Sequence, residues 1–393
     1  MKSSDQDASS YIISRKMVFL FACACGLIVG NLYYAQPLIS LIAPDIGLSD
    51  SWASFIVTLT QIGYCFGLIL LVPLGDLLEN RGLVVITLCG AVLALFLAVI
   101  APNANWFLFA SLLIGFSSVS VQMLIPYAAH FAPEAIRGRI VGNVTSGLLL
   151  GIMLSRPASS LIAHSLGWRA VFAISCIVLT FLALILRFNL PIRRPQVRQH
   201  YFSLIISLWS VLVETPVLRR RAIYHAGLFA SFTLFWTAIP ILLLSPTFQL
   251  SQQGIALFAL AGALGVVAAP IAGRLADKGL TKITTALAMC SVAIAFLLAQ
   301  FGADSLTLLV FAGILLDMGV HCNLVLGQRA IYALKPEIRS RLNALYMTIF
   351  FAGGALGSAV ASAAYSYGGW TMVAWIGFSF PCIVLLFFIT EII

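Results

Sequence analysis

The sequence has few charged side chains. Asp, Glu, Lys and Arg make up 9% of its 393 residues, whereas 61% of the residues are hydrophobic. A soluble domain carries about a quarter charged residues, so this composition excludes a soluble protein and indicates a membrane protein. The sequence also lacks a Walker-type phosphate loop, H-E-x-x-H and G-x-S-x-G, which argues against an ATP-driven pump and against an enzyme. A transporter-like sensor would normally carry a soluble output domain, and no such domain is apparent in this sequence.

Acidic residues are scarcer than basic ones, with 13 Asp and Glu against 22 Lys and Arg. If the N-terminus is cytoplasmic, every Lys and Arg falls in a cytoplasmic segment except Arg156, inside a helix, and Arg169, outside. This positive-inside pattern predicts that both termini are cytoplasmic, and it explains the basicity without nucleic acid as a partner. Tryptophans at the predicted outer helix ends are expected to be interfacial anchors: Trp52, Trp106, Trp168 and Trp370.

Long apolar runs are abundant. A membrane-spanning helix needs roughly 20 mostly apolar residues, and the sequence predicts twelve such spans: 17–42, 52–73, 83–101, 105–131, 140–163, 168–187, 222–245, 253–274, 283–302, 305–332, 342–364 and 370–390. The alternating pattern of barrel strands is absent, so the predicted fold class is an all-α polytopic membrane protein. All eight cysteines lie in these spans, and we expect no disulfide, no metal and no cofactor.

The sequence repeats itself about halfway along. "VPLGDLLENRG" (72–82) returns as "APIAGRLADKG" (269–279), and Gly151 and "GW" at 167–168 return 202 residues later. These repeats predict two six-helix halves, residues 1–187 and 222–393, joined by a basic cytoplasmic segment, 188–221. Within that segment, the short apolar stretch 201–213 is expected to form a helix on the inner membrane surface.

Several stretches, taken in order, carry a family resemblance: "NLYYAQPL" (31–38), "PLGDLLENRG" (73–82), "MLSRPAS" (153–159), "FWTAIPILL" (235–243), "LLDMGV" (315–320) and "RLNALYMTIFFAGGALGS" (341–358). The chain resembles a twelve-helix member of the major facilitator superfamily, and is similar to bacterial drug/proton antiporters and arabinose-efflux-like permeases. The resemblance implies a monomeric multi-pass transporter of the bacterial cytoplasmic (inner) membrane that works by alternating access.

In that superfamily the loop between the second and third helices has a pattern like G-x-x-x-D-R-x-G-R-R. The repeated phrase matches it in part and predicts a cytoplasmic gate formed by Gly75, Asp76, Glu79 and Arg81 and, in the second copy, by Gly273, Asp277 and Lys278. The glycine is expected to let two helix backbones approach, and an acid to bind helix N-terminal amides. Asn80 and Leu83 depart from the pattern, and the alternative is that these charges only mark a cytoplasmic turn.

Ionisable residues inside a predicted span are functional candidates because their burial in lipid is costly. Asp317 and His321 are four residues apart in the tenth span and therefore share a helix face. A carboxylate and an imidazole facing a cavity can exchange protons, so we expect this pair to couple transport to protons. The alternative is a structural pair that never titrates.

Arg156 is always charged, so it needs a carboxylate, carbonyl groups or an anionic ligand. Pairing with Asp317 and binding of a substrate anion are both open. The other candidate substrate contacts are polar or aromatic residues that share helix faces: Asn31, Tyr34, Gln61, Gln122, His225, Trp236 and Gln328. Ser111 stands where many similar antiporters have an arginine, so proton coupling here cannot use that residue.

The residues therefore predict a secondary transporter whose partners are a small-molecule substrate, protons and the lipid bilayer. The favoured function is proton-coupled efflux of small amphipathic or drug-like compounds. The alternative is proton-coupled uptake of a small anionic metabolite, which Arg156 would favour.

Overall fold

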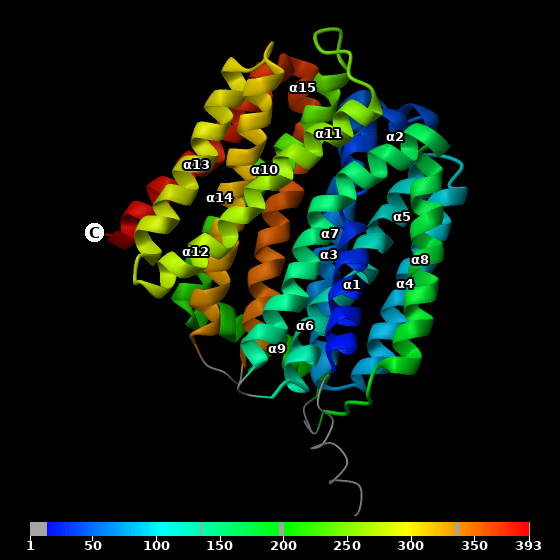
Figure 1. Cartoon of the computed structure of the whole chain (residues 1–393), viewed down its shortest axis with the longest axis vertical. Helices are drawn as coiled ribbons and strands as arrows, with labels where there is room; N and C mark the ends of the chain where they lie inside the picture. The colour runs from blue at the N-terminus through cyan, green and yellow to red at the C-terminus, as the bar shows by residue number, and fades with distance from the viewer. Residues whose placement is uncertain (1–13, 134–135, 196–199, 335–337, 393) are drawn as a thin grey trace, which may run out of the picture.

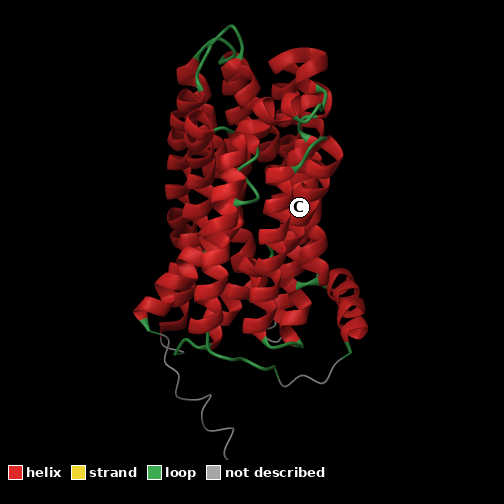
Figure 2. Cartoon of the chain, turned by 90° about the vertical axis from the view of Figure 1, so that its right-hand side faces the viewer, coloured by secondary structure: helices red, strands yellow, loops and turns green. Residues whose placement is uncertain are grey.

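The computed structural model describes residues 14–133, 136–195, 200–334 and 338–392. These residues form a bundle of helices joined by loops, without a β-strand among them (Figures 1 and 2). Three basic residues of the predicted charge pattern, Lys2, Arg198 and Lys335, lie outside the described residues.

The elements up to α8 are α1 (Arg15–Gly30), η1 (Gln36–Leu38), α2 (Ile39–Asp45), η2 (Asp50–Trp52), α3 (Phe55–Leu70), η3 (Val72–Asp76), α4 (Asn80–Ile100), α5 (Ala104–Ser117), α6 (Ser120–His130), α7 (Arg137–Leu166) and α8 (Trp168–Asn189). The elements that follow are α9 (Tyr201–Glu214), α10 (Pro216–Leu244), α11 (Gln252–Gly262), η5 (Ala263–Val267), α12 (Ala268–Asp277), α13 (Thr281–Phe301), α14 (Leu306–Tyr332) and α15 (Arg339–Ile392).

Nine helical segments of the described chain are long and apolar enough to cross a membrane, whereas the sequence predicts twelve spans. Three predicted spans are interrupted: 17–42 is divided into α1 and α2, 253–274 into α11 and α12, and 105–131 into α5 and α6, although the last pair still counts as one apolar segment, Ala104–His130. Two others, 342–364 and 370–390, are joined in α15, which is kinked at Gly368 and Gly369. The predicted all-helical architecture is thus confirmed, with helices that are less uniform than predicted.

The first interruption has a local cause at Asn31. Its side-chain amide nitrogen donates to the carbonyl groups of Leu27 and Ile28, 3.1 and 3.0 Å away, and so satisfies acceptors at the end of α1. Its Oδ1 accepts a 2.7 Å hydrogen bond from Ser175 of α8. A proline follows in η1, where it has no backbone N–H to donate. The prediction of one continuous helix over 17–42 is wrong for this reason.

The two "GW" pairs occupy equivalent turns. Gly167 between α7 and α8 and Gly369 within α15 have φ of 83° and 61°, a backbone conformation that favours glycine. The indole of Trp168 donates to Asp45 over 3.1 Å. The tryptophan of the second pair, Trp370, donates to the carbonyl of Ala299 over 2.7 Å.

The tryptophans of these pairs are 7% and 5% exposed, so the prediction that Trp168 and Trp370 are interfacial anchors is wrong. Their N–H groups bind protein acceptors instead of the interface, Trp168 the exposed carboxylate of Asp45 and Trp370 the carbonyl of buried Ala299. Trp52 and Trp106, which are 55% and 50% exposed, remain suited to that role.

Glycines bring two helix pairs into backbone contact. A Cβ atom on Gly151 of α7 would lie 2.3 Å from the carbonyl oxygen of Gly26 in α1. The residue 202 positions later, Gly353 of α15, stands in the same relation to Ala226 of α10, at 2.2 Å. Small residues allow such contact between membrane helices. The sequence repeat therefore corresponds to a repeated helix packing, α1 on α7 and α10 on α15.

One end of the bundle, called here the α9 end, carries α9 and the start of α1; the opposite end, called the α2 end, carries α2 and the start of α11 (Figure 1). Among the described residues, all Lys and Arg except Arg156 and Arg169 belong to segments at the α9 end. α9 packs Leu204 and Leu208 against the bundle and leaves Phe202 and Trp209 exposed. An apolar exposed face suits contact with lipid.

Gly357→Ala in α15 is expected to destabilise the protein by about 1–3 kcal/mol, because its Cβ would lie 2.0 Å from the carbonyl oxygen of Ala230 in α10. The matched control is Gly142→Ala in α7, where a Cβ would meet nothing within 4 Å and helix propensity favours alanine. Thermal unfolding of the detergent-purified proteins measures the stability of both variants. Equal melting temperatures for the two variants would contradict the close helix packing.

Candidate functional site

Arg156 is the centre of a buried polar cluster. It lies on α7 and is 3% exposed, and its Nε donates a 2.8 Å hydrogen bond to Oε1 of Gln36. Its guanidinium carbon lies 4.6–5.1 Å from the ring centres of Tyr33, Phe232 and Trp236. Rings at this distance attract a cation through their quadrupoles and so offset part of its desolvation. The interrupted segment after α1 thus meets α10 around one positive charge.

Arg156 has no carboxylate at ion-pair distance among the described residues. Asp317 interacts with it electrostatically, but the four ion pairs found in the described chain do not include these two residues. Nη2 of Arg156 and Nε2 of Gln36 are buried without a hydrogen-bond partner. Of the two alternatives left open by the sequence, a direct Arg156–Asp317 pair is not formed in this structure.

Asp317 also contacts Trp236. It is 2% exposed, and its Oδ1 accepts a 2.8 Å hydrogen bond from the indole N–H of Trp236. His321, one turn further along α14, places Nδ1 2.7 Å from the backbone carbonyl of Asp317. Because a carbonyl only accepts, Nδ1 carries the proton, which leaves Nε2 as an acceptor in the neutral ring. The cluster therefore contains a carboxylate and an imidazole that can each accept a proton.

His225 on α10 forms a second polar contact with α14. Its Nδ1 lies 3.0 Å from the amide nitrogen of Asn323, and its ring stacks on Phe350 at 4.4 Å and on Tyr346 at 5.7 Å. Nε2 of His225 is buried without a partner. An orphaned polar atom in an apolar interior is costly, so it marks a position where a ligand or water would be stabilised.

Gln61 and Gln122 lie where α3 and α6 face α15. Gln61 is fully buried and both of its amide atoms lack a partner. Gln122 donates to the hydroxyl of Tyr64 over 3.2 Å and accepts from the side chain of Asn343 over 3.0 Å. Gln122 is therefore held by hydrogen bonds from both sides, whereas the amide of Gln61 has none.

Three predicted substrate residues lie apart from Arg156. Asn31 uses its amide within its own helix and toward α8, as described above. Tyr34 is half-buried in the turn after α1, beside Gly30. Gln328 is half-buried on α14, about 16 Å along the helix from Asp317 at 1.5 Å per residue. Their assignment to the substrate stays a prediction.

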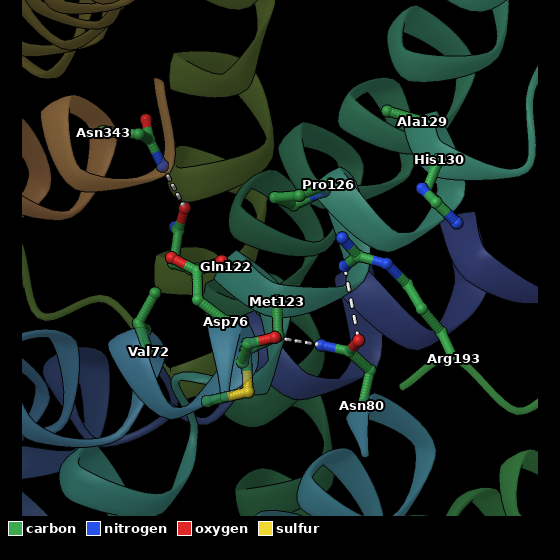
Figure 3. Close-up of a pocket in the computed structure, with 11 residues that line it drawn as sticks. Val72, Asp76, Asn80, Gln122, Met123, Pro126, Ala129, His130, Arg193 and Asn343 are labelled. Carbon is green, nitrogen blue, oxygen red and sulfur yellow. Dashed lines mark hydrogen bonds between the residues drawn. The ribbon is translucent and has the colours of Figure 1, made fainter. Parts of the chain in front are cut away.

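A cavity of about 320 Å³ opens at the α9 end and contains part of the predicted gate (Figure 3). It is lined by Val72, Gly75, Asp76, Asn80, Gln122, Met123, Pro126, Ala129, His130, Arg193 and Asn343. Asn80 donates to the carbonyl of Gly75 over 2.8 Å and accepts from Arg193 over 3.3 Å. Burial lowers the pKa of Arg193, and the nearby carboxylate of Asp76 acts in the opposite direction. Asn80, which departs from the family pattern, thus links the turn at Gly75 to Arg193.

The glycine of the first phrase does not have the role that we predicted from its sequence. A Cβ on Gly75 would lie 3.4 Å from Asn80 Nδ2 and meet no backbone atom at close range, so the predicted backbone approach at Gly75 is absent in this structure. The carboxylate of Glu79 caps α4 by accepting from the amides of Arg81 and Gly82, at 3.0 and 3.2 Å. That contact is the helix N-terminal role expected of an acid here.

The second phrase is held by a single arginine. Arg329 of α14 donates to the carbonyl of Gly273 over 3.3 Å and forms an ion pair with Asp277. Lys278 follows as the C-cap of α12. The side chains of Arg329 and Asp277 are 46% and 66% exposed, so this ion pair contributes little to stability, about 0–1 kcal/mol. A weak contact of this kind can form and break during a conformational change.

At the α2 end, hydroxyl groups join α3 to α15. Ser54 and Ser362 exchange two hydrogen bonds, each from a backbone amide to the other's Oγ, at 3.0 and 3.3 Å. Thr58 and Ser358 share a third, 3.0 Å between hydroxyl oxygens. All four residues are buried. No sequence pattern indicates these contacts, because isolated serines and threonines are common in membrane helices.

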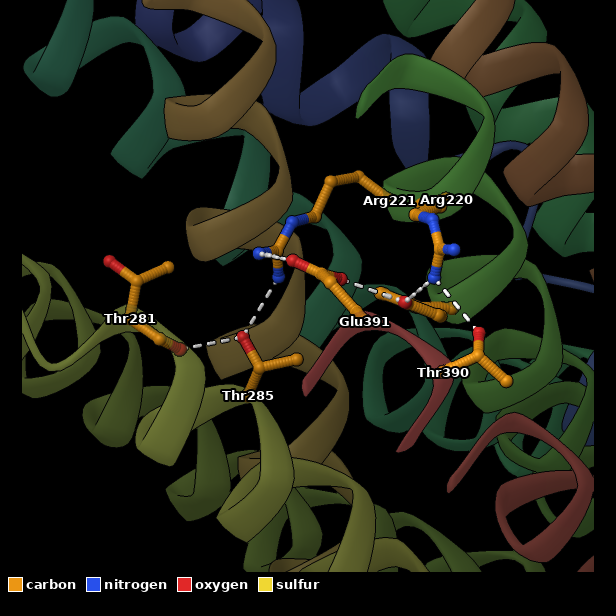
Figure 4. Close-up of polar contacts among 7 residues, drawn as sticks. Arg220, Arg221, Thr281, Thr285, Thr390 and Glu391 are labelled. Carbon is orange, nitrogen blue, oxygen red and sulfur yellow. Dashed lines mark hydrogen bonds and ion pairs between the residues drawn. The ribbon is translucent and has the colours of Figure 1, made fainter. Parts of the chain in front are cut away.

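An ionic network that sequence reasoning missed joins α10, α13 and the end of α15 (Figure 4). Arg221 pairs with Glu391 at 3.3 Å and donates to Thr285 over 3.0 Å. Tyr224 donates to the other oxygen of Glu391 over 2.8 Å. In the sequence, this network could have been indicated only by three consecutive arginines, 219–221, and by the acidic residue Glu391.

The described residues contain no group of three His, Cys, Asp or Glu side chains that could hold a metal ion.

Comparison with known proteins decides the family. The model of the Major Facilitator Superfamily matches residues 18–299 and 222–392. The chain belongs to the major facilitator superfamily. It is 38% identical over 374 residues to "Uncharacterized transporter YgaY" of Escherichia coli O157:H7, covering 95% of each chain. It is 32% identical over 365 residues to "Probable transporter SCO4007" of Streptomyces coelicolor, covering 91% of this chain and 83% of that one.

The superfamily fold is also found by structural comparison. The crystal structure of a point mutant of the nucleoside transporter NupG matches with a TM-score of 0.74 over 95% of this chain and 99% of that chain. At 14% sequence identity this likeness shows the fold alone. Membership establishes that the chain is a multi-pass membrane transporter with a small-molecule substrate and that it is not an enzyme.

Glu391→Gln is expected to lower the melting temperature of the purified protein, because Arg221, with 8% of its side chain exposed, would lose its carboxylate partner. Asp277→Asn removes an exposed ion pair and is expected to change the melting temperature little. Differential scanning fluorimetry in one detergent compares the two variants. The interpretation is wrong if Asp277→Asn destabilises as much as Glu391→Gln.

Proposed function

We propose that this superfamily member is a proton-coupled secondary transporter of a bacterial inner membrane. Residues 1–187 and 222–393 are two halves that rock about the Arg156 cluster, and residues 188–221 link them. The α9 end faces the cytoplasm, since basic residues gather there. The unit of transport is the monomer, because the central cluster is assembled within one chain.

Asp317 and His321 are proposed to carry the coupled proton. Asp317 is supported by its burial without an ion-pair partner in the described chain and by its single bond to Trp236. An intramembrane carboxylate in such a position is costly when charged, so a change of solvent access would favour uptake or release of a proton. His321 is supported by its acceptor nitrogen one turn away.

Two cargo classes fit this machinery. Efflux of small amphipathic compounds, as in drug/proton antiporters, is supported by the rings of Phe229, Phe232, Phe350 and Trp236, which pack in one aromatic group with His225 and His321. Uptake of a small anionic metabolite with protons is favoured by a specific observation, the unpartnered Nη2 of buried Arg156. A guanidinium without a carboxylate partner is complementary to an anion.

The repeated phrase is proposed to be a gate rather than a binding site. Gly75 and Asp76 line the cavity at the α9 end, Glu79 and Arg81 follow them in the same turn, and the second copy is held to α14 through Arg329. These contacts include solvent-accessible ion pairs and single hydrogen bonds. Each is weak enough to break and reform within the few kcal/mol that separate transporter states.

Asp317→Asn is expected to abolish proton-driven transport while leaving the protein folded. In energised everted vesicles the proton gradient is followed with a pH-sensitive acridine dye, and its dissipation is measured on adding panels of amphipathic drugs and of organic acids. Right-side-out vesicles test the opposite direction. The matched control is Asp304→Asn, an exposed acid at the α2 end. Retained gradient-driven transport in Asp317→Asn would rule out the proposed proton role.

Alternating access requires that the α2 end opens, so a cross-link there is expected to stop transport. Ser54→Cys with Ser362→Cys, in a background whose native cysteines are replaced, is oxidised and then reduced. Transport should fall to background on oxidation and return on reduction, while each single cysteine variant stays insensitive. Unchanged transport in fully cross-linked protein would show that α3 and α15 do not separate at this end.

A further inference from the structure

Two buried donors beside the aromatic rings have no acceptor. Nη2 of Arg156 and Nε2 of Gln36 belong to side chains that are 3% and 0% exposed, and neither has a hydrogen-bond partner. The 2.8 Å bond between Nε of Arg156 and Oε1 of Gln36 keeps the two side chains together. A buried donor without an acceptor is costly, and a charged one is more costly still. The arrangement is therefore incomplete without an acceptor.

The missing partner is defined by chemistry. Two neighbouring N–H donors, one of them cationic, match the two oxygens of a carboxylate. The rings of Tyr33, Phe232 and Trp236 surround the same guanidinium and offer an apolar surface to the rest of a ligand. We propose that the cargo is an amphipathic carboxylate whose anionic group binds Arg156 and Gln36. This inference rests on the proposed transport function and selects the anionic cargo class.

Asp317 gives this binding a link to protons. Trp236 contacts both Arg156 and the Asp317 carboxylate, so an ionised Asp317 repels an incoming carboxylate and competes for the same positive charge. Protonation of Asp317 removes both effects. Cargo and proton therefore stabilise each other on the protein and cross the membrane together. This coupling corresponds to uptake driven by an inward proton gradient rather than to exchange.

Other groups near Asp317 carry charge or titrate, and the experiment has to separate them. They are Arg156 on α7, Tyr33 after α1, His225 on α10, Tyr346 on α15 and His321 on α14. Each histidine would also favour an anion when protonated. Replacement of His225 by glutamine therefore serves as the control for Asp317, because the proposed function gives His321 a share of the coupled proton.

The first experiment uses wild-type protein in detergent without any gradient. Phenylacetate and indole-3-acetate are the carboxylate probes, and phenylacetamide and phenethylamine are the neutral and cationic matches. We expect the two carboxylates to raise the melting temperature and to quench tryptophan fluorescence, and the amide and the amine to do neither. Failure of both carboxylates, or equal stabilisation by the amide, overturns the proposal. Stabilisation by the amine that Asp317→Asn abolishes would show a cation site and overturns it too.

The second experiment tests the two residues. Arg156→Gln is expected to abolish phenylacetate binding, and Arg156→Lys to weaken it, because lysine cannot reproduce the planar fork. If Arg156→Gln fails to fold, the wild-type comparison and Gln36→Met, expected to weaken binding several-fold, decide the question. Unchanged phenylacetate affinity in a folded Arg156→Gln protein contradicts the proposal.

The pH dependence identifies the linked proton. Phenylacetate stays ionised between about pH 6 and pH 8, so its wild-type Kd should rise with pH, by at most about tenfold per unit for one linked proton. Asp317→Asn should bind phenylacetate tightly at every pH, whereas His225→Gln should keep the wild-type slope. A wild-type slope in Asp317→Asn overturns the linkage.

The proposed proton role of Asp317 and the proposed anion site at Arg156 can be rejected independently of each other. Carboxylate binding combined with intact gradient-driven transport in Asp317→Asn rejects the proton role and keeps the anion site. Loss of gradient-driven transport in Asp317→Asn without any carboxylate binding in the wild type keeps the proton role and rejects the anion site.

Discussion

A permanent positive charge inside the membrane is the constraint on which this structure depends. Arg156 cannot lose its proton, so the fold has to replace the water that the guanidinium leaves. It does so with Gln36 and three aromatic rings rather than with a carboxylate at contact distance. The interrupted segment between α1 and α2 supplies two of these groups, Tyr33 and Gln36.

Strong and weak contacts are distributed unequally around that charge. α1 on α7 and α10 on α15 meet through backbone contacts at glycines such as Gly151 and Gly353, which tolerate no added atom. Across the two proposed halves, by contrast, α3 meets α15 through a few hydroxyl hydrogen bonds, and Gln122 meets Asn343 through one amide bond. Each net hydrogen bond is worth about 1 kcal/mol. These few polar contacts between the halves suit the proposed rocking motion, in which the helix pairs within each half stay together.

The sequence predicts the architecture well because hydropathy, charge bias and repeats are properties of whole segments. It predicts individual contacts poorly, since these depend on which atoms meet. Gly75 and Gly151 look alike in a motif, yet only Gly151 lies against another backbone. Trp168 and Trp370 match an interfacial position but bury their N–H groups on acceptors. Mid-span charges are recognisable as candidates in the sequence, whereas Gln36 becomes one only through its contact with Arg156 in the structure.

The position of the charge then connects electrostatics to motion. Arg156 comes from α7 and Asp317 from α14, on the two sides of the proposed interface, and Trp236 contacts both of them. Any change in the charge of Asp317, or any anion bound to Arg156, alters the attraction across that interface. At an effective dielectric of about 20, two unit charges 4 Å apart interact by about 4 kcal/mol, which is of the same order as the three hydrogen bonds between α3 and α15 at the α2 end. In the proposed function, the occupancy of this cluster therefore biases which end of the transporter is open.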